Sequence, residues 1–128
     1  MRYTLLMHYP EMTAEDLGPE MLAEGMAAFD RYTTALEAAG VLRSAEVLQP
    51  SAMSTTVSLA SGELVVQDGP FADTKEQLGG TVVIDVPDLD AALEWARQAP
   101  PVHYGVVEVR PSATHVVDGA WTTHLTYE

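Results

Sequence analysis

The feature that most constrains the fold is a change of hydrophobic period along the chain. Residues 2–9, "RYTLLMHY", alternate and place Tyr3, Leu5, Met7 and Tyr9 on one face. A period of two predicts a β-strand with that face in the core. Prolines and glycines follow most of the apolar runs, so the chain is expected to fold as a series of separate elements.

A long helix is predicted from Pro19 to Ala39, where apolar residues recur at helical spacing. Pro19 suits the first helical turn, and Gly40 suits the position just beyond the last one. In the preceding loop, Thr13 and Asp16 have the spacing of a capping box. The stripe expected to face the core consists of Leu22, Met26, Phe29, Thr33 and Leu36.

Five more strands and one more helix are expected after the first helix. The strands are residues 41–48, 54–60, 63–67, 80–86 and 104–111. The helix spans residues 88–99, with Asp88 as its N-cap. Its expected buried stripe is Leu89, Ala92, Leu93 and Ala96. The final residues predict a hairpin that turns at Asp118 and Gly119.

This order of elements predicts an α+β domain. Helices of unequal length separate the strands, which favours a ferredoxin-like antiparallel sheet with two helices on one face. The domain should span residues 1–111, followed by a C-terminal β-hairpin extension over residues 112–128. Apolar residues occupy both faces of strands 2–9 and 80–86, so the second face of the sheet needs a cover. A second copy is the simplest cover, and we expect a homodimer.

Charge and composition exclude several classes of partner. The chain has 128 residues and a net charge of −13, which suits one domain and disfavours nucleic acid and membrane surfaces. No apolar run has the length of a membrane span, and the N-terminus lacks a signal-peptide pattern, so we expect a cytoplasmic location. The chain contains no cysteine, and His103, His115 and His124 lack metal-binding spacing. We therefore expect no metal and no cofactor.

Residues 64–80, "LVVQDGPFADTKEQLGG", form the most distinctive stretch. Gly69 tolerates a positive φ, and Pro70 stops the strand that precedes it. Asp73 is expected to cap a short helix that ends at Gly79. The stretch is therefore predicted to turn a corner between two strands.

Two side chains of this stretch have further expected roles. Phe71 should fill the corner by packing into the core. Lys75 is the only lysine and has no part in any turn, so its side chain is either solvated or functional. Near a pocket, its positive charge would suit an anionic substrate in an otherwise acidic protein.

The segments "DGPFADTKEQLGG", "VIDVPDLDAALEWA" and "VEVRP" together resemble the DGPF-type branch of the YCII-related family. The resemblance runs from the first strand to Pro111. It implies a ferredoxin-like protomer that pairs into a dimeric α+β barrel, with a small pocket between the sheet and the first helix. It also implies two kinds of role: acid–base enzymes with a His and an Asp at the pocket, and partners of extracytoplasmic-function sigma factors.

The chain departs from the family pattern at this pocket. The family's histidine would fall at Phe29, whose ring cannot carry a proton. The carboxylate of the pair would correspond to Asp85, and Asp73 stands where the family usually has Glu. The His–Asp mechanism therefore does not transfer directly, and Phe29 is expected to line the ligand site instead.

His8 is the candidate to replace the missing histidine, because an imidazole titrates near neutrality. Asp68 or Asp85 would orient it; the alternative is a half-buried histidine bonded to backbone. Arg43 lies on an apolar strand face. It would either bind an anionic group together with Lys75, or form a structural ion pair with Asp68 or Asp85.

Two functions stay open at this point. The first is a cofactor-free enzyme of isomerase or lyase type that moves a proton on a small, anionic organic molecule. The second is a non-catalytic regulatory or binding module whose acidic surface engages a sigma factor. Phe29 favours the second function, whereas His8 and Lys75 favour the first.

Overall fold

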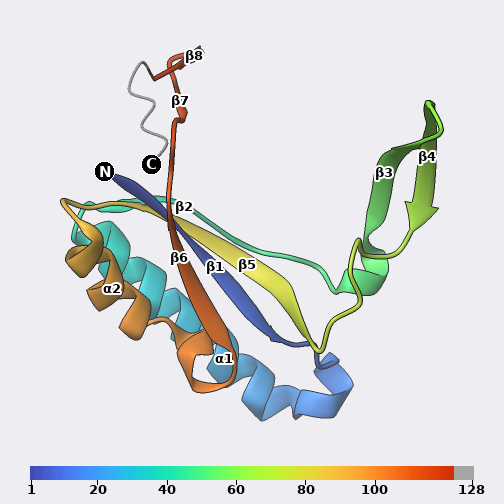
Figure 1. The fold of residues 1–128 in the computed structure, drawn as a ribbon. Coiled ribbons are helices and arrows are strands. Elements are labelled where there is room, and N and C mark those ends of the chain that lie inside the picture. Colours follow the sequence, from blue (N-terminus) through green and yellow to red (C-terminus); the bar gives the residue numbers. More distant parts are fainter. Residues whose placement is uncertain (123–128) are drawn as a thin grey trace.

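The computed structural model describes residues 1–122, in which two helices cover one face of a four-stranded antiparallel sheet (Figure 1). Residues 123–128 of the expected C-terminal extension, with His124, lie outside the described residues. The predicted α+β fold with an antiparallel sheet and two helices is confirmed. The sheet has the strand order β2–β5–β1–β6. These elements are β1 (Arg2–Pro10), β2 (Leu42–Val47), β5 (Glu76–Asp85), β6 (Val106–Pro111), α1 (Ala14–Ala38) and α2 (Leu89–Arg97).

Two pairs of strands lie outside this sheet. Among the described residues, β3 (Thr55–Ala60) pairs only with β4 (Glu63–Asp68), and β7 (Val116–Val117) pairs only with β8 (Ala120–Trp121). Two short 3₁₀ helices complete the description, η1 (Ser51–Met53) and η2 (Pro100–His103). The predicted strands at residues 54–60 and 63–67 therefore exist, but they form a separate hairpin. We call residues 55–68 the arm.

β1 lies in the middle of the sheet and carries the centre of the core. Its residues Tyr3, Leu5 and Met7 are buried, which confirms the alternation read from the sequence. Leu5 faces Val82 of β5 on one side and Val109 of β6 on the other. Side chains directly opposite one another point to the same face, so these three strands share one apolar surface.

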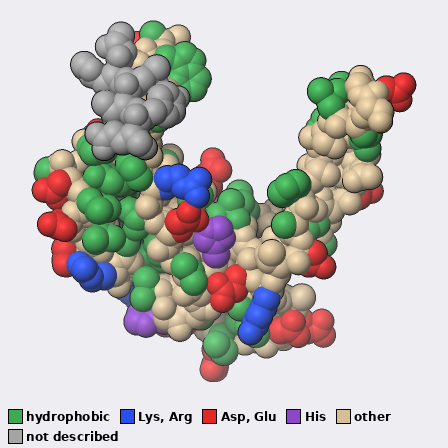
Figure 2. Space-filling view, viewed as in Figure 1, with side chains coloured by type: hydrophobic (Ala, Val, Ile, Leu, Met, Phe, Trp, Pro, Cys, Tyr) green, Lys and Arg blue, Asp and Glu red, His purple; other side chains and the backbone are tan. Residues whose placement is uncertain are grey.

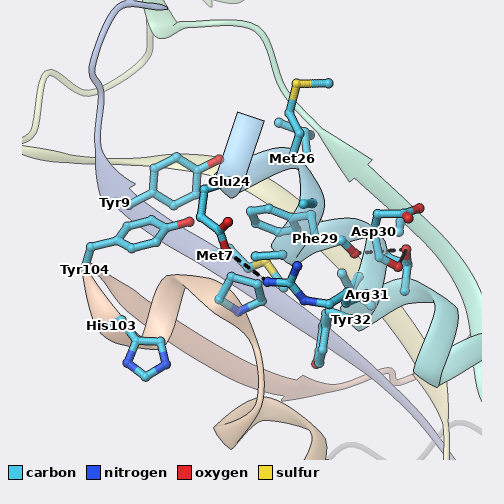
Figure 3. Close-up of a pocket in the computed structure, with 18 of the residues that line it drawn as sticks. Met7, Tyr9, Glu24, Met26, Phe29, Asp30, Arg31, Tyr32, His103 and Tyr104 are labelled. Carbon is cyan, nitrogen blue, oxygen red and sulfur yellow. Dashed lines mark hydrogen bonds and ion pairs between the residues drawn. The ribbon is translucent and has the colours of Figure 1, made fainter. Parts of the chain in front are cut away.

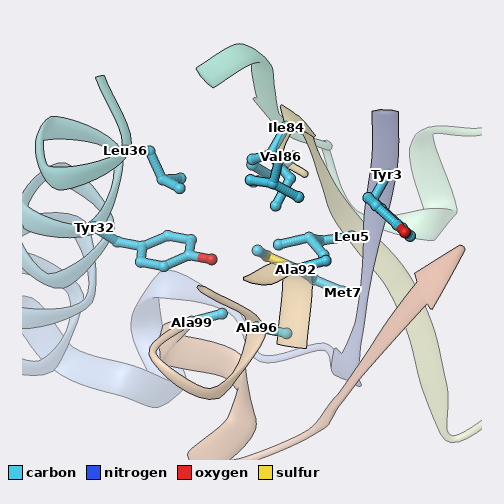
Figure 4. Packing of buried hydrophobic residues seen from close by; sticks show 11 residues of the cluster. Tyr3, Leu5, Met7, Tyr32, Leu36, Ile84, Val86, Ala92, Ala96 and Ala99 are labelled. Atoms are coloured by element: carbon cyan, nitrogen blue, oxygen red, sulfur yellow. The ribbon is translucent and has the colours of Figure 1, made fainter. Parts of the chain in front are cut away.

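Both helices pack on that surface (Figure 4). α1 contributes the buried side chains Tyr32 and Leu36, and α2 contributes Ala92 and Ala96. The small alanines let α2 approach the sheet closely. The Tyr32 hydroxyl donates a hydrogen bond to the carbonyl oxygen of Trp95 at 2.7 Å, which joins the two helices. Burial raises the pKa of the Tyr32 phenol, which therefore remains a donor.

α1 begins earlier than predicted and is interrupted. The predicted capping box is present, with the Asp16 amide donating to Thr13 Oγ1 at 3.0 Å. Gly18, at φ +79°, breaks the helix, and helical spacing resumes at Pro19. The expected stripe is only half correct: Leu36 is buried, but Met26 is 69% exposed. The reason is that the N-terminal half of α1 faces the sheet across an open groove.

The corner at residues 69–76 differs from the prediction in two ways. No helix forms at Asp73; β5 begins at Glu76, which pairs with Pro10 of β1. Phe71 does not enter the core and is 98% exposed. Side-chain bonds hold the corner extended, because the Gln77 amide donates to the Ala72 carbonyl at 2.9 Å. Long-range strand pairing therefore prevails over the local capping signal.

Several predicted chain reversals are present. Gly69 has φ +106° and Gly40 has φ +75°, so both glycines occupy the conformation that the sequence required of them. Asp88 caps α2 by accepting from the Ala91 amide at 2.9 Å. A turn at Asp118 and Gly119, both with positive φ, joins β7 to β8.

Gly80 offers a test of the packing between β2 and β5. A Cβ at this position would lie 2.8 Å from the Glu46 carbonyl oxygen, which is backbone and cannot rotate away. We expect Gly80→Ala to lower the free energy of unfolding by about 1–3 kcal/mol, as overpacking does. Urea unfolding monitored by circular dichroism measures the change.

Gly25 is the matched control, since it lies in α1 and a Cβ there meets nothing within 4 Å. Gly25→Ala should raise the free energy of unfolding by about 0.5–1 kcal/mol through helix propensity alone. Equal effects of the two substitutions would contradict the register given for β2 and β5.

Candidate functional site

A groove of about 1670 Å³ separates α1 from the helix-facing side of the sheet (Figure 3). Its walls are mainly apolar and come from β1, α1, β2 and the segment around η2. Side chains that line it include Met7, Tyr9, Met21, Met26, Phe29 and Tyr104. This is the place where the family resemblance implied a pocket, and Phe29 lies in its wall as expected.

Two tyrosines form one end of the groove. Tyr9 ends β1 and Tyr104 follows η2; their ring centroids lie 5.6 Å apart in an edge-to-face arrangement. Gly79 makes room for this pair, because a Cβ there would collide with the Tyr9 ring. Burial raises the pKa of both phenols. Both hydroxyls therefore stay protonated near neutral pH and act as hydrogen-bonding groups rather than as bases.

The charges around the groove are mostly negative. Glu24, Asp30 and Glu37 line it, while Arg31 is the only lysine or arginine among its described lining residues. Arg31 is already paired with Glu24 at 3.1 Å, in an exposed contact that contributes little stability. An anion entering the groove would meet repulsion from the remaining carboxylates.

His8 lies on the other face of the sheet. Its Nε2 is 3.2 Å from Glu108 Oε1, and Glu108 also accepts from Arg110 at 2.5 Å. A smaller hollow of about 660 Å³ is formed by His8, Leu78, Phe71 and the base of the arm. His8 is thus in a concave place, but not in the groove beside α1.

The carboxylate beside His8 is perturbed by its neighbours. The hydrogen bond from Arg110, and next the one involving His8, holds the pKa of Glu108 below its ordinary 4.5. Glu108 is thus a stable anion at neutral pH.

Asp85 is engaged elsewhere. It accepts from the N-terminal amino group at 3.0 Å, and Arg43 lies 3.7 Å away, so the structural ion pair foreseen for Arg43 is present. The hydrogen bond from the amino terminus is the main cause that lowers the pKa of Asp85. His8 and Asp85 occupy opposite ends of the sheet, because His8 pairs with Leu78, about 23 Å from Asp85 along β5.

Asp68 and Lys75 lie away from both of these clusters. Both side chains are exposed, and within residues 1–122 neither forms an ion pair. The structure therefore does not bring His8, Asp68 and Asp85 together. Arg43 and Lys75 do not line the groove.

The sequence analysis missed Glu108, Tyr9 and Tyr104. Glu108 carried a signal that was overlooked, since Glu108 and Arg110 alternate with valines and so share one face of an apolar strand. Tyr9 and Tyr104 lie far apart in the sequence, and only the pairing of β1 with β6 brings their regions together. No local pattern pointed to this contact.

Two further kinds of feature are absent from residues 1–122. No group of three or more His, Asp or Glu side chains is arranged to hold a metal ion in that range. None of its helices is both long and apolar enough to cross a membrane.

Residues 1–113 match the YCII-related domain. The chain belongs to the YCII-related family. The match includes all four strands of the sheet, both helices and the arm. The chain is also 43% identical over 79 residues to an uncharacterised protein of Rhizobium meliloti (strain 1021). That similarity covers 60% of this chain and 64% of the relative, so it spans less than two thirds of the relative's length.

The cluster around His8 predicts a specific order of pKa changes. Arg110→Gln should raise the pKa of Glu108 toward 4.5, and His8→Gln should raise it less, because the bond from Arg110 has the larger effect. Carboxyl ¹³C NMR titration of the three proteins measures this order.

The same shift has a consequence for stability. A folded-state pKa below the unfolded one stabilises the fold above the unfolded pKa, and that contribution is lost as the pH falls through the folded pKa. Acidification below about pH 4.5 should therefore destabilise the wild type more steeply than Arg110→Gln. Identical acid-unfolding curves would argue against the Glu108–Arg110 contact.

Proposed function

We propose that this protein is a homodimeric binding protein that holds a small, largely apolar and neutral organic molecule in the groove between α1 and the sheet. The observation that supports this most directly is the composition of the groove. Methionine and phenylalanine side chains form its walls, and two protonated tyrosine hydroxyls lie at one end. Concave, apolar sites with a few polar groups are typical of small-molecule pockets.

The charge of the groove favours a neutral ligand over an anionic one. The anionic ligand was expected from Arg43 and Lys75, and neither lines the groove. The groove instead has Glu24, Asp30 and Glu37 around it. A flat aromatic molecule with one hydroxyl would pack against Phe29 and exchange hydrogen bonds with a tyrosine.

The neutral probe 1-naphthol and the anion 1-naphthoate test this preference, because they share one ring system. We expect 1-naphthol to bind at least about tenfold more tightly, and to shift the NMR signals of Phe29 and the Tyr9–Tyr104 pair. Tyr104→Ala removes an aromatic wall and should weaken 1-naphthol binding about two- to tenfold. Titration by NMR or calorimetry gives both affinities.

Trp121→Ala is the matched control, since Trp121 is exposed and lies outside the groove. It should leave the affinity for 1-naphthol unchanged. Tighter binding of 1-naphthoate, or equal losses in the two variants, would overturn the proposed site.

The sheet face opposite the helices supports the homodimer. The side chains on it include Leu6 and Val83, which are only half-buried in a single chain. The strand order β2–β5–β1–β6 with two helices on one face supports the ferredoxin-like description. Two such sheets packed through their open faces would form the dimeric α+β barrel that the resemblance implies. The proposal also places the chain in the DGPF-type branch of the family.

Val83→Lys tests this interface. A lysine on the covered face would leave an unpaired charge in the dimer and should weaken association on the order of 100-fold. Val102→Lys, on the exposed η2 segment beside the helices, should not change it. Sedimentation velocity over a concentration series measures both, with thermal unfolding as the check of folding; a monomeric wild type would overturn the homodimer.

Acid–base chemistry is the second candidate function, and the pairing of His8 with Glu108 favours it. In this form of the hypothesis His8 is the proton carrier and Glu108 replaces Asp68 or Asp85 as the group that orients it. The hollow at the base of the arm would hold the substrate. The sigma-factor association and the cytoplasmic location stay predictions from the sequence.

A further inference from the structure

The arm has one strongly apolar face that no other part of residues 1–122 covers. Val57 pairs directly with Val66, and Leu59 pairs with Leu64. Directly paired and alternating residues share a face, so these four side chains form one surface. Each of them is 64–73% exposed. The opposite face carries Ser58, Thr56 and Gln67 together with the half-buried Val65.

A lone two-stranded hairpin is only marginally stable in water. Within residues 1–122, β3 and β4 have no further strand beside them, and the arm leaves the sheet as a separate body (Figure 1). Its connection to the rest consists mainly of the corner at its base, where the Gly69 amide donates to the Ser54 carbonyl at 2.8 Å. The arm therefore needs an external surface to bury its apolar face.

The position of the arm indicates which surface this is. The base of the arm and Phe71 border the hollow of His8, which lies on the sheet face opposite the helices. Figures 1 and 2 show the arm and the β7–β8 ribbon rising from opposite ends of the sheet, so that the described chain is hollowed between them. Val116, Val117 and Trp121 of the β7–β8 ribbon are exposed as well.

The distribution of charge favours a second copy of the chain as the partner that covers the arm. The chain carries a net charge of −13, so self-association requires an interface in which the carboxylates are few or already neutralised. On the sheet face Glu108 pairs with Arg110 and lies beside His8, and Asp85 pairs with Arg43 and the N-terminal amino group, so two of the carboxylates on this face already have partners within the chain. Glu46 and Glu76 also lie on this face. The arm has no lysine or arginine for a phosphate or an anionic lipid.

We propose that the arm of each copy docks on the other copy, so that the two chains clasp one another and Phe71 becomes buried in the dimer. This inference rests on the proposed homodimer and adds the part of the chain that holds it together. Each copy has both an arm and an open sheet face. Two reciprocal contacts around a two-fold axis would therefore bury the apolar face of both arms and cover both sheets.

The chain has no cysteine, so single cysteines report directly on exposure. Leu59→Cys places a thiol on the apolar face of the arm, and Ser58→Cys places one on the opposite face of the same strand. At concentrations where sedimentation shows a dimer, we expect the thiol at position 59 to react with a maleimide at least tenfold more slowly than the thiol at position 58. On dilution to monomer the two rates should converge.

Leu64→Asp and Ser58→Asp give a second readout that does not depend on labelling. Both add one negative charge to the arm, outside the core. Leu64→Asp should weaken dimerisation at least tenfold, and Ser58→Asp should leave it unchanged, with both proteins keeping the wild-type melting temperature in the monomer.

The outcomes separate the two proposals. If the wild type is a dimer but both thiols react equally and Leu64→Asp dimerises normally, the clasp is overturned and the homodimer stands. If the thiol at position 59 stays protected in the monomer, the arm folds back on its own chain and the clasp is overturned. If no concentration yields a dimer, the homodimer fails, and the clasp fails with it.

Discussion

The structure depends on the pairing of β1 with both β5 and β6. This pairing buries the row of Tyr3, Leu5 and Met7 and gives both helices a surface on which to pack. It also divides the chemistry of the protein, because neighbouring side chains of a strand point to opposite faces. At the end of β1, Tyr9 enters the groove beside α1, and His8 points to the open face.

This division explains why the molecule has two candidate sites with different character. The groove is apolar, large and rimmed by carboxylates, and its tyrosines are kept protonated by burial. The hollow of His8 is smaller, and the His8 ring in its wall lies 3.2 Å from Glu108. The groove suits binding of a neutral molecule, whereas the hollow suits proton transfer or closure by another chain. One strand thus contributes to two separate candidate sites without bringing their residues into contact.

Local signals in the sequence were reliable where no distant contact competed with them. The alternation in β1, the capping box at Thr13 and the N-cap at Asp88 are all present because each depends on residues a few positions away. The helix expected at Asp73 is absent because β5 extends to Glu76 to pair with β1. The fold class followed from the order of the elements, but the separation of the arm did not.

The site was harder to predict because it depends on contacts between distant residues. His8 and Glu108 are 100 positions apart and meet only through the pairing of β1 with β6. Asp68 and Asp85 were plausible partners by residue type, but neither shares that end of the sheet face with His8. Phe29 was placed correctly because the end of α1 gave a fixed point from which to count.

The isolated arm has a consequence for the behaviour of the protein in solution. A hairpin with two unpaired edges and an apolar face is a template for edge-to-edge association, which leads to aggregation. The arm itself has only Glu63 and Asp68 as charged residues to prevent this. The large negative charge on the rest of the chain keeps separate molecules apart, so the acidic surface protects solubility while an unclasped arm is exposed.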